Sequence, residues 1–409
     1  MQGYFTAVRR NFRLQFLSAL SISLLTLVFC SITANAQSAI TSGATWKDTS
    51  GNTIEVHGGG MIKVGSTYYW FGEADDGSVN FNFAGINCYS STNLTNWTYE
   101  GDILPPQSSG DLVVGNVVQR PKILYNSSTS TYVMLLHIDN SSYSLNHVGY
   151  ATSSSVCGTY SYKGSSKPLG NKSYDIGAFE DSNGDGYLLT TDNDTALRIE
   201  LLASDYLSPS KVVATLPSME GASMIHDGSY YYVLCSHLTG WAPNDDQYAY
   251  ATSPSGTWSS LADFAQSGTN TYSSQTSWIL PVTGTSGTVY MYMGDRWDAN
   301  QISDSTYVWL PLAISGTSVS MADYSTWYLN VPAGTWSASG GTPPTTGSYT
   351  ELISDNSGMC LSAVNTAEGT QLEQATCTGS TLQLWDVTTE GSGYNITNEA
   401  TGYVADDSG

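Results

Sequence analysis

Short runs of aromatic and β-branched residues, separated by polar turns, dominate the chain, and helical periodicity is nearly absent. Runs of this length, bounded by Gly, Asn, Asp and Ser, are typical of β-strands. Five of them resemble one another: Thr67–Trp70, Thr131–Met134, Gly186–Leu189, Tyr230–Val233 and Val289–Tyr292. Most follow a tight turn, and several precede a second strand and a small-residue turn that ends in an aromatic residue.

The spacing of these runs predicts a repeat architecture. Each unit takes about 40–65 residues and about four strands, which is the sequence signature of propeller blades. We expect five blades between residues 37 and 336, and therefore an all-β, five-bladed β-propeller. A β-sandwich is the competing interpretation, but it would not explain the repeated strand–turn–strand unit.

Two further segments follow the predicted propeller. Residues 337–348 are rich in Gly, Ser, Thr and Pro, which predicts a linker. Within residues 349–409, the motif at 383–385 is the Gln-x-Trp of ricin-type β-trefoil lectins, and this segment resembles the start of such a carbohydrate-binding module. A trefoil needs three repeats, so we expect a partial ricin-type β-trefoil with an exposed apolar face.

The first 36 residues have the features of a signal peptide. Arg9, Arg10 and Arg13 precede an apolar stretch over residues 16–32, and an Ala-Asn-Ala cleavage site ends at Ala36. An anchoring helix is the alternative, but the stretch is short for one. We therefore expect a secreted or periplasmic protein with no membrane contact after signal cleavage.

Five cysteines follow the expected cleavage site. Cys360 and Cys377 lie in one small segment, and we expect them to form a disulfide in an oxidising compartment. Cys88, Cys157 and Cys235 lie far apart in the sequence and are interpreted as buried small apolar residues. No Cys/His spacing suggests zinc, so the sequence predicts no metal ligands.

The charge balance narrows the class of partner. With 13 Lys and Arg against 35 Asp and Glu, the formal net charge is −22. Such a chain repels polyanions, so we expect neither nucleic acid nor an anionic membrane as a partner. Aromatic residues make up 12% of the chain, including 28 Tyr and 11 Trp. Because aromatic faces suit sugars, we expect a polysaccharide or oligosaccharide as the partner.

Two motifs suggest chemistry that the rest of the sequence does not support. His57–Gly60 resembles an esterase oxyanion-hole loop, but the chain has no G-x-S-x-G elbow and no βαβ pattern, so we reject that interpretation. Asp181–Gly186, with Asp192 at the twelfth position, resembles half of an EF-hand loop. No helices flank it, so a turn between two blade strands is the better interpretation. We expect no cofactor, and a structural calcium ion stays an open alternative.

Two carboxylates stand out because each precedes an apolar run. Glu220 enters a strand from Ser218–Met219, and Asp175 precedes Ile176–Gly177. A buried carboxyl group beside a second carboxylate is held protonated near neutral pH, which a general acid needs. A surface location remains the default for any single acidic residue.

Motifs over about residues 45–330 identify a family. They comprise Glu55–Gly60, Tyr68–Glu73, Gln119–Lys122, Asp175, Glu220, Thr239–Asn244, Ser274–Thr276, Gly294–Trp297 and Asp304–Leu312. With these motifs in this order, the chain resembles glycoside hydrolase family 43, and within it the exo-β-1,3-galactanases. The resemblance implies a five-bladed propeller that hydrolyses glycosidic bonds with inversion.

The same resemblance implies catalytic roles. Glu220 matches the general acid, and Asp175 matches the carboxylate that tunes its pKa and orients it. Most of the family carries a base Asp in the first blade, but here that position falls within Gly58–Gly60. The galactanase branch lacks that Asp too, and Gln275 matches the glutamine thought to position the water or act as the base there. Glu55 is the alternative base.

Candidate sugar-binding residues come from matching positions: Glu73, Gln119, Tyr143, Asn193, Gly240 and Trp241. Relatives usually carry Glu where this chain has Gln119, so one charge is lost there. For Tyr143 and Trp241 the alternative role is packing within a blade.

We therefore expect an exo-β-1,3-galactanase that releases galactose from β-1,3-galactan, the backbone of arabinogalactan. Two alternatives stay open. One is another family 43 activity, such as an α-L-arabinofuranosidase or a β-xylosidase. The other is a catalytically inactive carbohydrate-binding protein.

Overall fold

The computed structural model describes residues 37–77, 82–338, 349–354, 359–366, 370–378, 380–390, 393–401 and 404–405. The predicted signal peptide and all but the first two residues of the predicted linker lie outside these residues. In the described ranges, no helix has the length and apolar character that a membrane crossing requires.

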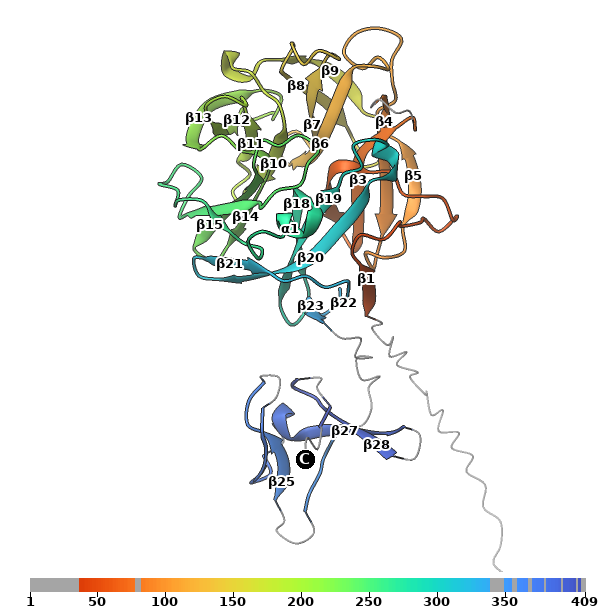
Figure 1. The fold of residues 1–409 in the computed structure, drawn as a ribbon, viewed down its shortest axis with the longest axis vertical. Helices are drawn as coiled ribbons and strands as arrows, with labels where there is room; N and C mark the ends of the chain where they lie inside the picture. The colour runs from red at the N-terminus through yellow and green to blue at the C-terminus, as the bar shows by residue number, and fades with distance from the viewer. Residues whose placement is uncertain are drawn as a thin grey trace, which may run out of the picture. The chain divides into compact units, whose positions relative to one another are not determined.

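Five four-stranded antiparallel sheets follow one another along the chain (Figure 1). The first is β2 (His57–Val64), β3 (Thr67–Asp75), β4 (Phe83–Ser91) and β5 (Thr98–Asp102). The second is β6 (Val117–Asn126), β7 (Thr131–Asp139), β8 (His147–Ser153) and β9 (Ser161–Ser166). The third is β10 (Ile176–Glu180), β11 (Gly186–Thr191), β12 (Leu197–Leu202) and β13 (Pro209–Leu216).

The fourth sheet is β14 (Glu220–Asp227), β15 (Tyr230–Ser236), β16 (Gln247–Ala251) and β17 (Ala262–Asp263). The fifth is β18 (Gln275–Thr283), β19 (Thr288–Arg296), β20 (Thr306–Ser315) and β21 (Ser318–Met321). Short helical turns lie in the connections: η1 (Pro168–Gly170), α1 (Asn270–Ser273) and η2 (Ile302–Asp304). The five similar runs of the sequence all fall in the second strand of a sheet, namely β3, β7, β11, β15 and β19, which confirms that they are strands.

The first strands of the five sheets pack against one another in order, and β18 contacts β2. A sixth, three-stranded sheet joins the two ends of this region: β1 (Ser38–Thr41) pairs with β22 (Thr326–Asn330), and β22 pairs with β23 (Thr335–Ser337). Counting each sheet as a blade gives a six-bladed β-propeller, so the prediction of five blades is wrong. The sixth sheet combines strands almost 290 residues apart and contains none of the repeated runs, so the repeat pattern did not predict it.

The interior of the propeller is apolar and strongly aromatic. One cluster packs Trp70, Trp97, Trp309 and Trp327, all 2% exposed or less. The interpretation of Cys88 and Cys157 as unpaired residues is wrong, because they form a disulfide between β4 and the turn after β8. This bond ties the first sheet to the second. Cys235 is buried and unpaired, as predicted.

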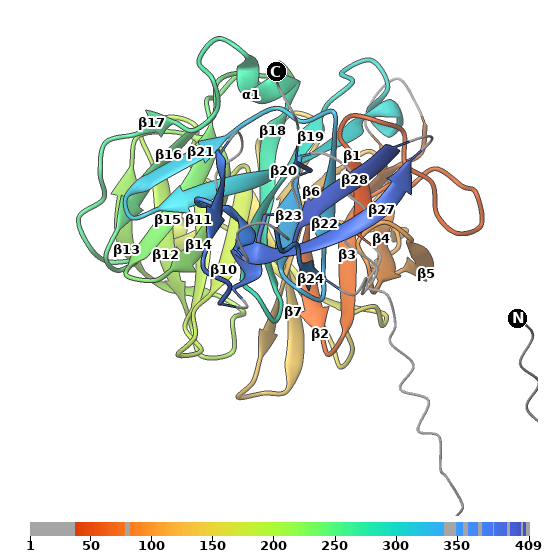
Figure 2. The ribbon, with the colours of Figure 1, turned by 90° about the horizontal axis from the view of Figure 1, so that it is seen from below.

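The C-terminal segment is also all-β. It contains β24 (Thr350–Glu351), β25 (Cys360–Ala363), β26 (Leu372–Ala375), η3 (Thr381–Gln383), β27 (Leu384–Glu390) and β28 (Gly393–Asn398), and Figure 2 shows the antiparallel pair β27–β28. Cys360 and Cys377 form the predicted disulfide.

The Gln-x-Trp motif of this segment is structural. Trp385 is buried, and its indole nitrogen donates to the carbonyl of Leu361 at 2.9 Å. The amide oxygen of Gln383 accepts from the backbone and the hydroxyl of Thr378. The segment also exposes large apolar side chains: Ile353, Met359, Val364, Leu372, Val387 and Val404.

Candidate active site

The predicted site residues lie at one end of the propeller strands. Glu220 and Gln275 are the first residues of β14 and β18, and Gln119 lies near the start of β6. Glu73 lies near the end of β3, and Trp241 follows the end of β15. In an antiparallel pair the start of one strand meets the end of the next, so five sheets deliver side chains to the same end.

These residues line a cavity of about 360 Å³. It brings together nine of the ten predicted residues: Glu73, Gln119, Tyr143, Asp175, Asn193, Glu220, Gly240, Trp241 and Gln275. Tyr143 is 43% exposed and Trp241 is partly buried, so neither is a core residue of a blade. The predicted catalytic and sugar-binding residues therefore share one cavity.

Irregular pairing shapes this end of the propeller. Register shifts occur in four pairs of first and second strands, between His57 and Gly60, Gln119 and Lys122, Glu220 and Ser223, and Thr276 and Trp278. A bulge re-aims the side chains around it, which is why bulges are frequent next to active sites. At Arg120 the backbone has a φ of 52°, a left-handed conformation that a non-glycine residue adopts at a cost.

Arg120 connects the polar groups of the cavity. Its backbone N–H donates to Oε2 of Glu73 at 2.8 Å, and its guanidinium pairs with Oδ2 of Asp175 at 2.8 Å. The guanidinium also donates to the carbonyl of Thr276 at 3.1 Å and to Oε1 of Gln275. Arg120 is 5% exposed, and its carboxylate partners offset the cost of burying its charge.

Glu220 has the properties of a general acid. It is 8% exposed, and burial, followed by the negative charge of Asp175, raises its pKa to about 8. Its carboxyl group is therefore largely protonated at neutral pH and able to give a proton to a leaving oxygen. Gln275 lies next to it, with Nε2 donating to Oε1 of Glu220 at 3.2 Å.

The cavity also holds polar atoms that the protein leaves unsatisfied. Nε2 of Gln119 and Oδ1 of Asn193 are buried and have no hydrogen-bond partner among the described residues. Burial also raises the pKa of Glu73 to about 8. Because unpaired buried polar atoms cost free energy, these groups point to a polar ligand that would satisfy them.

Glu55, the alternative base, does not line the cavity. It precedes β2, is partly buried, and burial raises its pKa. The structure therefore brings Gln275, and not Glu55, together with Glu220.

Four lining residues had no assigned role from the sequence: Arg120, His137, Tyr174 and Trp297. Arg120 and Trp297 belong to the family motifs given above, so their membership of these motifs could have indicated a role in the site. His137 pairs with Gln119 across β6 and β7, a contact that only the strand register shows.

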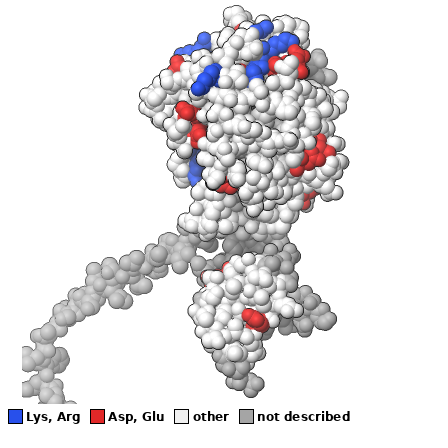
Figure 3. Space-filling view, turned by 90° about the vertical axis from the view of Figure 1, so that its left-hand side faces the viewer, with Lys and Arg blue, Asp and Glu red and all other residues white. Residues whose placement is uncertain are grey.

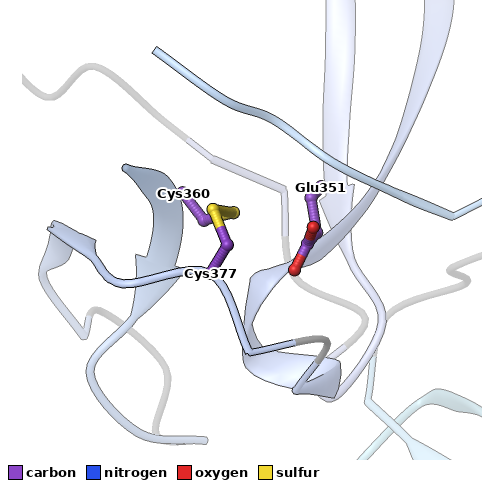
Figure 4. Close-up of side chains that lie close together, drawn as sticks. All are labelled: Glu351, Cys360 and Cys377. Atoms are coloured by element: carbon purple, nitrogen blue, oxygen red, sulfur yellow. A yellow bond between two sulfur atoms is a disulfide. The ribbon is translucent and has the colours of Figure 1, made fainter. Parts of the chain in front are cut away.

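The side chains of the two candidate metal groups make other bonds within the protein. Asp181–Gly186 forms the predicted turn between β10 and β11, with Asp181 bound by the Tyr231 hydroxyl and Asp192 by Arg198. Among the described residues, one set of possible metal ligands lies close together, Glu351 with Cys360 and Cys377 (Figure 4). Its two cysteines share a disulfide, so neither offers the thiolate that binds a metal.

An all-β propeller whose strand ends converge on a buried, protonated carboxyl group, a second carboxylate and an arginine has the site of a glycoside hydrolase. The model described as "Glycosyl hydrolases family 43" matches residues 57–260, and the model described as "Ricin-type beta-trefoil lectin domain-like" matches residues 323–409.

Solved structures agree with this assignment. An exo-β-1,3-galactanase from Clostridium thermocellum is 35% identical, with a TM-score of 0.71, and the match covers 90% of this chain and 82% of that one. An exo-β-1,3-galactanase from Phanerochaete chrysosporium, solved with galactose, is 34% identical, with a TM-score of 0.70 and coverage of 88% and 78%. A family 43 β-1,3-galactosidase is 29% identical, with a TM-score of 0.65 and coverage of 69% and 99%.

No curated protein matches the chain significantly. On the structural and family matches together, the chain belongs to glycoside hydrolase family 43.

Proposed function

We propose that this glycoside hydrolase is a secreted exo-β-1,3-galactanase that releases galactose from the end of β-1,3-galactan. The observation that carries the proposal is the single cavity in which Glu220, Asp175 and Gln275 meet the predicted sugar-binding residues. Glu220 would protonate the leaving oxygen, Asp175 would keep Glu220 protonated, and Gln275, whose Nε2 donates to Oε1 of Glu220, would orient the acid.

The choice of sugar and linkage rests on the relatives. The two exo-β-1,3-galactanases share 34–35% identity with this chain over most of its length, and one of them was solved with galactose. A cavity of about 360 Å³ lies at the small end of ligand sites, which favours the end of a polysaccharide over a long internal stretch.

The surface supports a neutral substrate. Figure 3 shows a face on which most atoms belong to uncharged residues and the charged side chains form small separate groups. A formal charge of −22 would repel an acidic polymer but not a neutral galactan. Secretion is the part of the proposal that rests on the signal-peptide features of residues 1–36.

Hydrolysis of β-1,3-galactan, followed by time-resolved NMR, tests the proposal. We expect galactose as the only early product, and α-galactose as the first anomer, because inversion converts the β-linkage. Glu220→Gln should abolish release and serves as the blank. A ladder of oligosaccharides would contradict exo action, and cleavage of arabinosides or xylosides in place of galactan would move the chain elsewhere in the family.

A non-catalytic carbohydrate-binding protein is the second candidate. The loss of the usual base to Gly58–Gly60 favours it, as does an amide at Gln119 where relatives carry a carboxylate. In that case wild type and Glu220→Gln would bind galactan equally, and neither would release sugar on long incubation.

A further inference from the structure

Every hydrogen-bonding atom of the Gln275 side chain has protein partners. Its Oε1 accepts from the indole Nε1 of Trp297 at 2.8 Å and from the guanidinium of Arg120. Its Nε2 donates to Oγ of Ser236 at 2.9 Å and to Oε1 of Glu220 at 3.2 Å. Both lone pairs and both N–H bonds of this amide are thus used within the protein.

The identity of these partners fixes which way the amide points. An indole N–H and a guanidinium can only donate, so only the amide oxygen can face them. A rotation by 180° would turn the N–H bonds of Gln275 toward the N–H bonds of Trp297 and Arg120. A proton placed on Oε1, as in an imidic acid, would meet the same two donors. Gln275 is therefore held as an ordinary amide with its nitrogen toward Glu220.

We propose that Trp297 is a positioning residue that acts through Gln275: its indole N–H, with Arg120, locks the amide so that Nε2 donates to Oε1 of Glu220. This inference deepens the proposed function and rests on it. The carbonyl oxygen of a protonated carboxyl group is the better acceptor, so this bond favours Oε2 as the oxygen that carries the acidic proton. Trp297 thereby biases which oxygen of Glu220 gives up the proton.

The Trp297 ring is itself held by its neighbours. It lies 5.0 Å from the ring of Trp241 at an interplanar angle of 69°, and the Arg120 guanidinium lies 5.6 Å from its centre. This contact with Trp241 also allows a simpler role, in which Trp297 only supports the sugar-binding wall. The two roles differ in kinetics, because a wall residue affects KM and a residue that orients the acid affects kcat.

Trp297→Phe removes the indole N–H and keeps an aromatic ring. Trp278→Phe is the matched control, because Trp278 lies in the same strand as Gln275, but its indole N–H has no partner among the described residues. On the substrate that wild type cleaves, we expect Trp297→Phe to lower kcat about tenfold to hundredfold with little change in KM. Trp297→His, which keeps a ring N–H, should retain more activity than Trp297→Phe.

The pKa of Glu220, followed by ¹³C NMR of labelled carboxyl groups, provides a readout without substrate. A donor stabilises the ionised carboxylate, so a freed Gln275 amide should raise the pKa of Glu220 by roughly half a unit or more. Trp278→Phe should leave it unchanged. This titration separates the two proposals: if wild type releases no galactose from galactan, the proposed function fails, while the NMR comparison still tests Trp297.

Combining Trp297→Phe with Gln275→Ala completes the test. If Trp297 acts through Gln275, the double variant should have the same Glu220 pKa as Gln275→Ala alone. An additive shift, an unchanged pKa in Trp297→Phe, or a loss confined to KM would each overturn the inference.

Discussion

Arg120 shows how one side chain can organise a site made from several sheets. It starts in β6 and reaches Glu73 of the first sheet, Asp175 before the third, and Gln275 of the fifth. With the positive φ of this residue, the backbone N–H points to Glu73 while the guanidinium reaches Asp175 and Gln275. Three acidic or amide groups are thus held by the backbone and side chain of one buried arginine, which fixes their spacing before substrate arrives.

The electrostatics of Glu220 lead to a pH prediction. A general acid works only while protonated, so kcat/KM should fall as the pH rises through the Glu220 pKa of about 8. Asp175→Asn removes the negative charge that helps to raise this pKa. The alkaline limb of the pH profile should then move to lower pH by about one unit.

The exposed residue Asp194, which pairs with Lys172 on the surface, provides the control. Asp194→Asn should leave the alkaline limb in place. If Asp175→Asn moves the limb upward or not at all, Asp175 does not act on Glu220 through its charge.

At the level of elements, the sequence predicted strands better than it predicted their irregularities. The second strands β3, β7, β11, β15 and β19 are long aromatic and β-branched runs, and each was identified. The bulges at the starts of the first strands depend on pairing across a sheet, which local composition does not encode. Arg120 shows this most clearly, since nothing in its neighbours predicts a left-handed conformation.

The candidate site was predicted mainly from family motifs, whereas the strands were predicted from local sequence patterns. Glu220 and Asp175 could be singled out by their apolar surroundings, but their roles, and those of Gln275 and Trp241, came from the family motifs. The hydrogen bonds of Gln275 to Trp297 and Ser236 join residues that the sequence separates by 22 and 39 positions. Such contacts follow from the closed ring of sheets and from no local pattern.

The Cys88–Cys157 disulfide leads to a prediction at the same scale. It closes a loop of 69 residues between two sheets, and a cross-link of this length stabilises a chain by about 4 kcal/mol through the unfolded state. Replacing both cysteines with Ala should lower the urea midpoint of the propeller accordingly. Replacing Cys360 and Cys377, which are 17 residues apart, should leave that midpoint unchanged, because their loop lies in the C-terminal segment. A midpoint unaffected by the first replacement would show that the core alone supports the inter-sheet contact.

At the scale of the whole molecule, the sixth sheet holds the two ends of the propeller region together. By pairing β1 with β22, it joins the chain that enters the five four-stranded sheets to the chain that leaves them. Fraying at either end must therefore break hydrogen bonds to the other. The sequence could not show this, because β1 is only four residues long and its partner lies almost the full length of the propeller away.

The C-terminal segment should contribute binding rather than chemistry. The described residues that line the cavity all belong to the propeller, and the family match for the C-terminal segment is to a lectin-type domain. Removing residues 339–409 should therefore leave kcat/KM on β-1,3-galactobiose within about twofold of wild type. On long galactan chains, a second binding module raises apparent affinity by effective concentration, so its removal should weaken binding about tenfold or more. Pull-down on insoluble galactan and hydrolysis of the disaccharide, measured on the same preparations, separate the two effects.

If the truncated protein is pulled down as well as wild type, the C-terminal segment does not contribute to galactan binding. If the truncated protein is folded but no longer hydrolyses the disaccharide, the segment supports the active site.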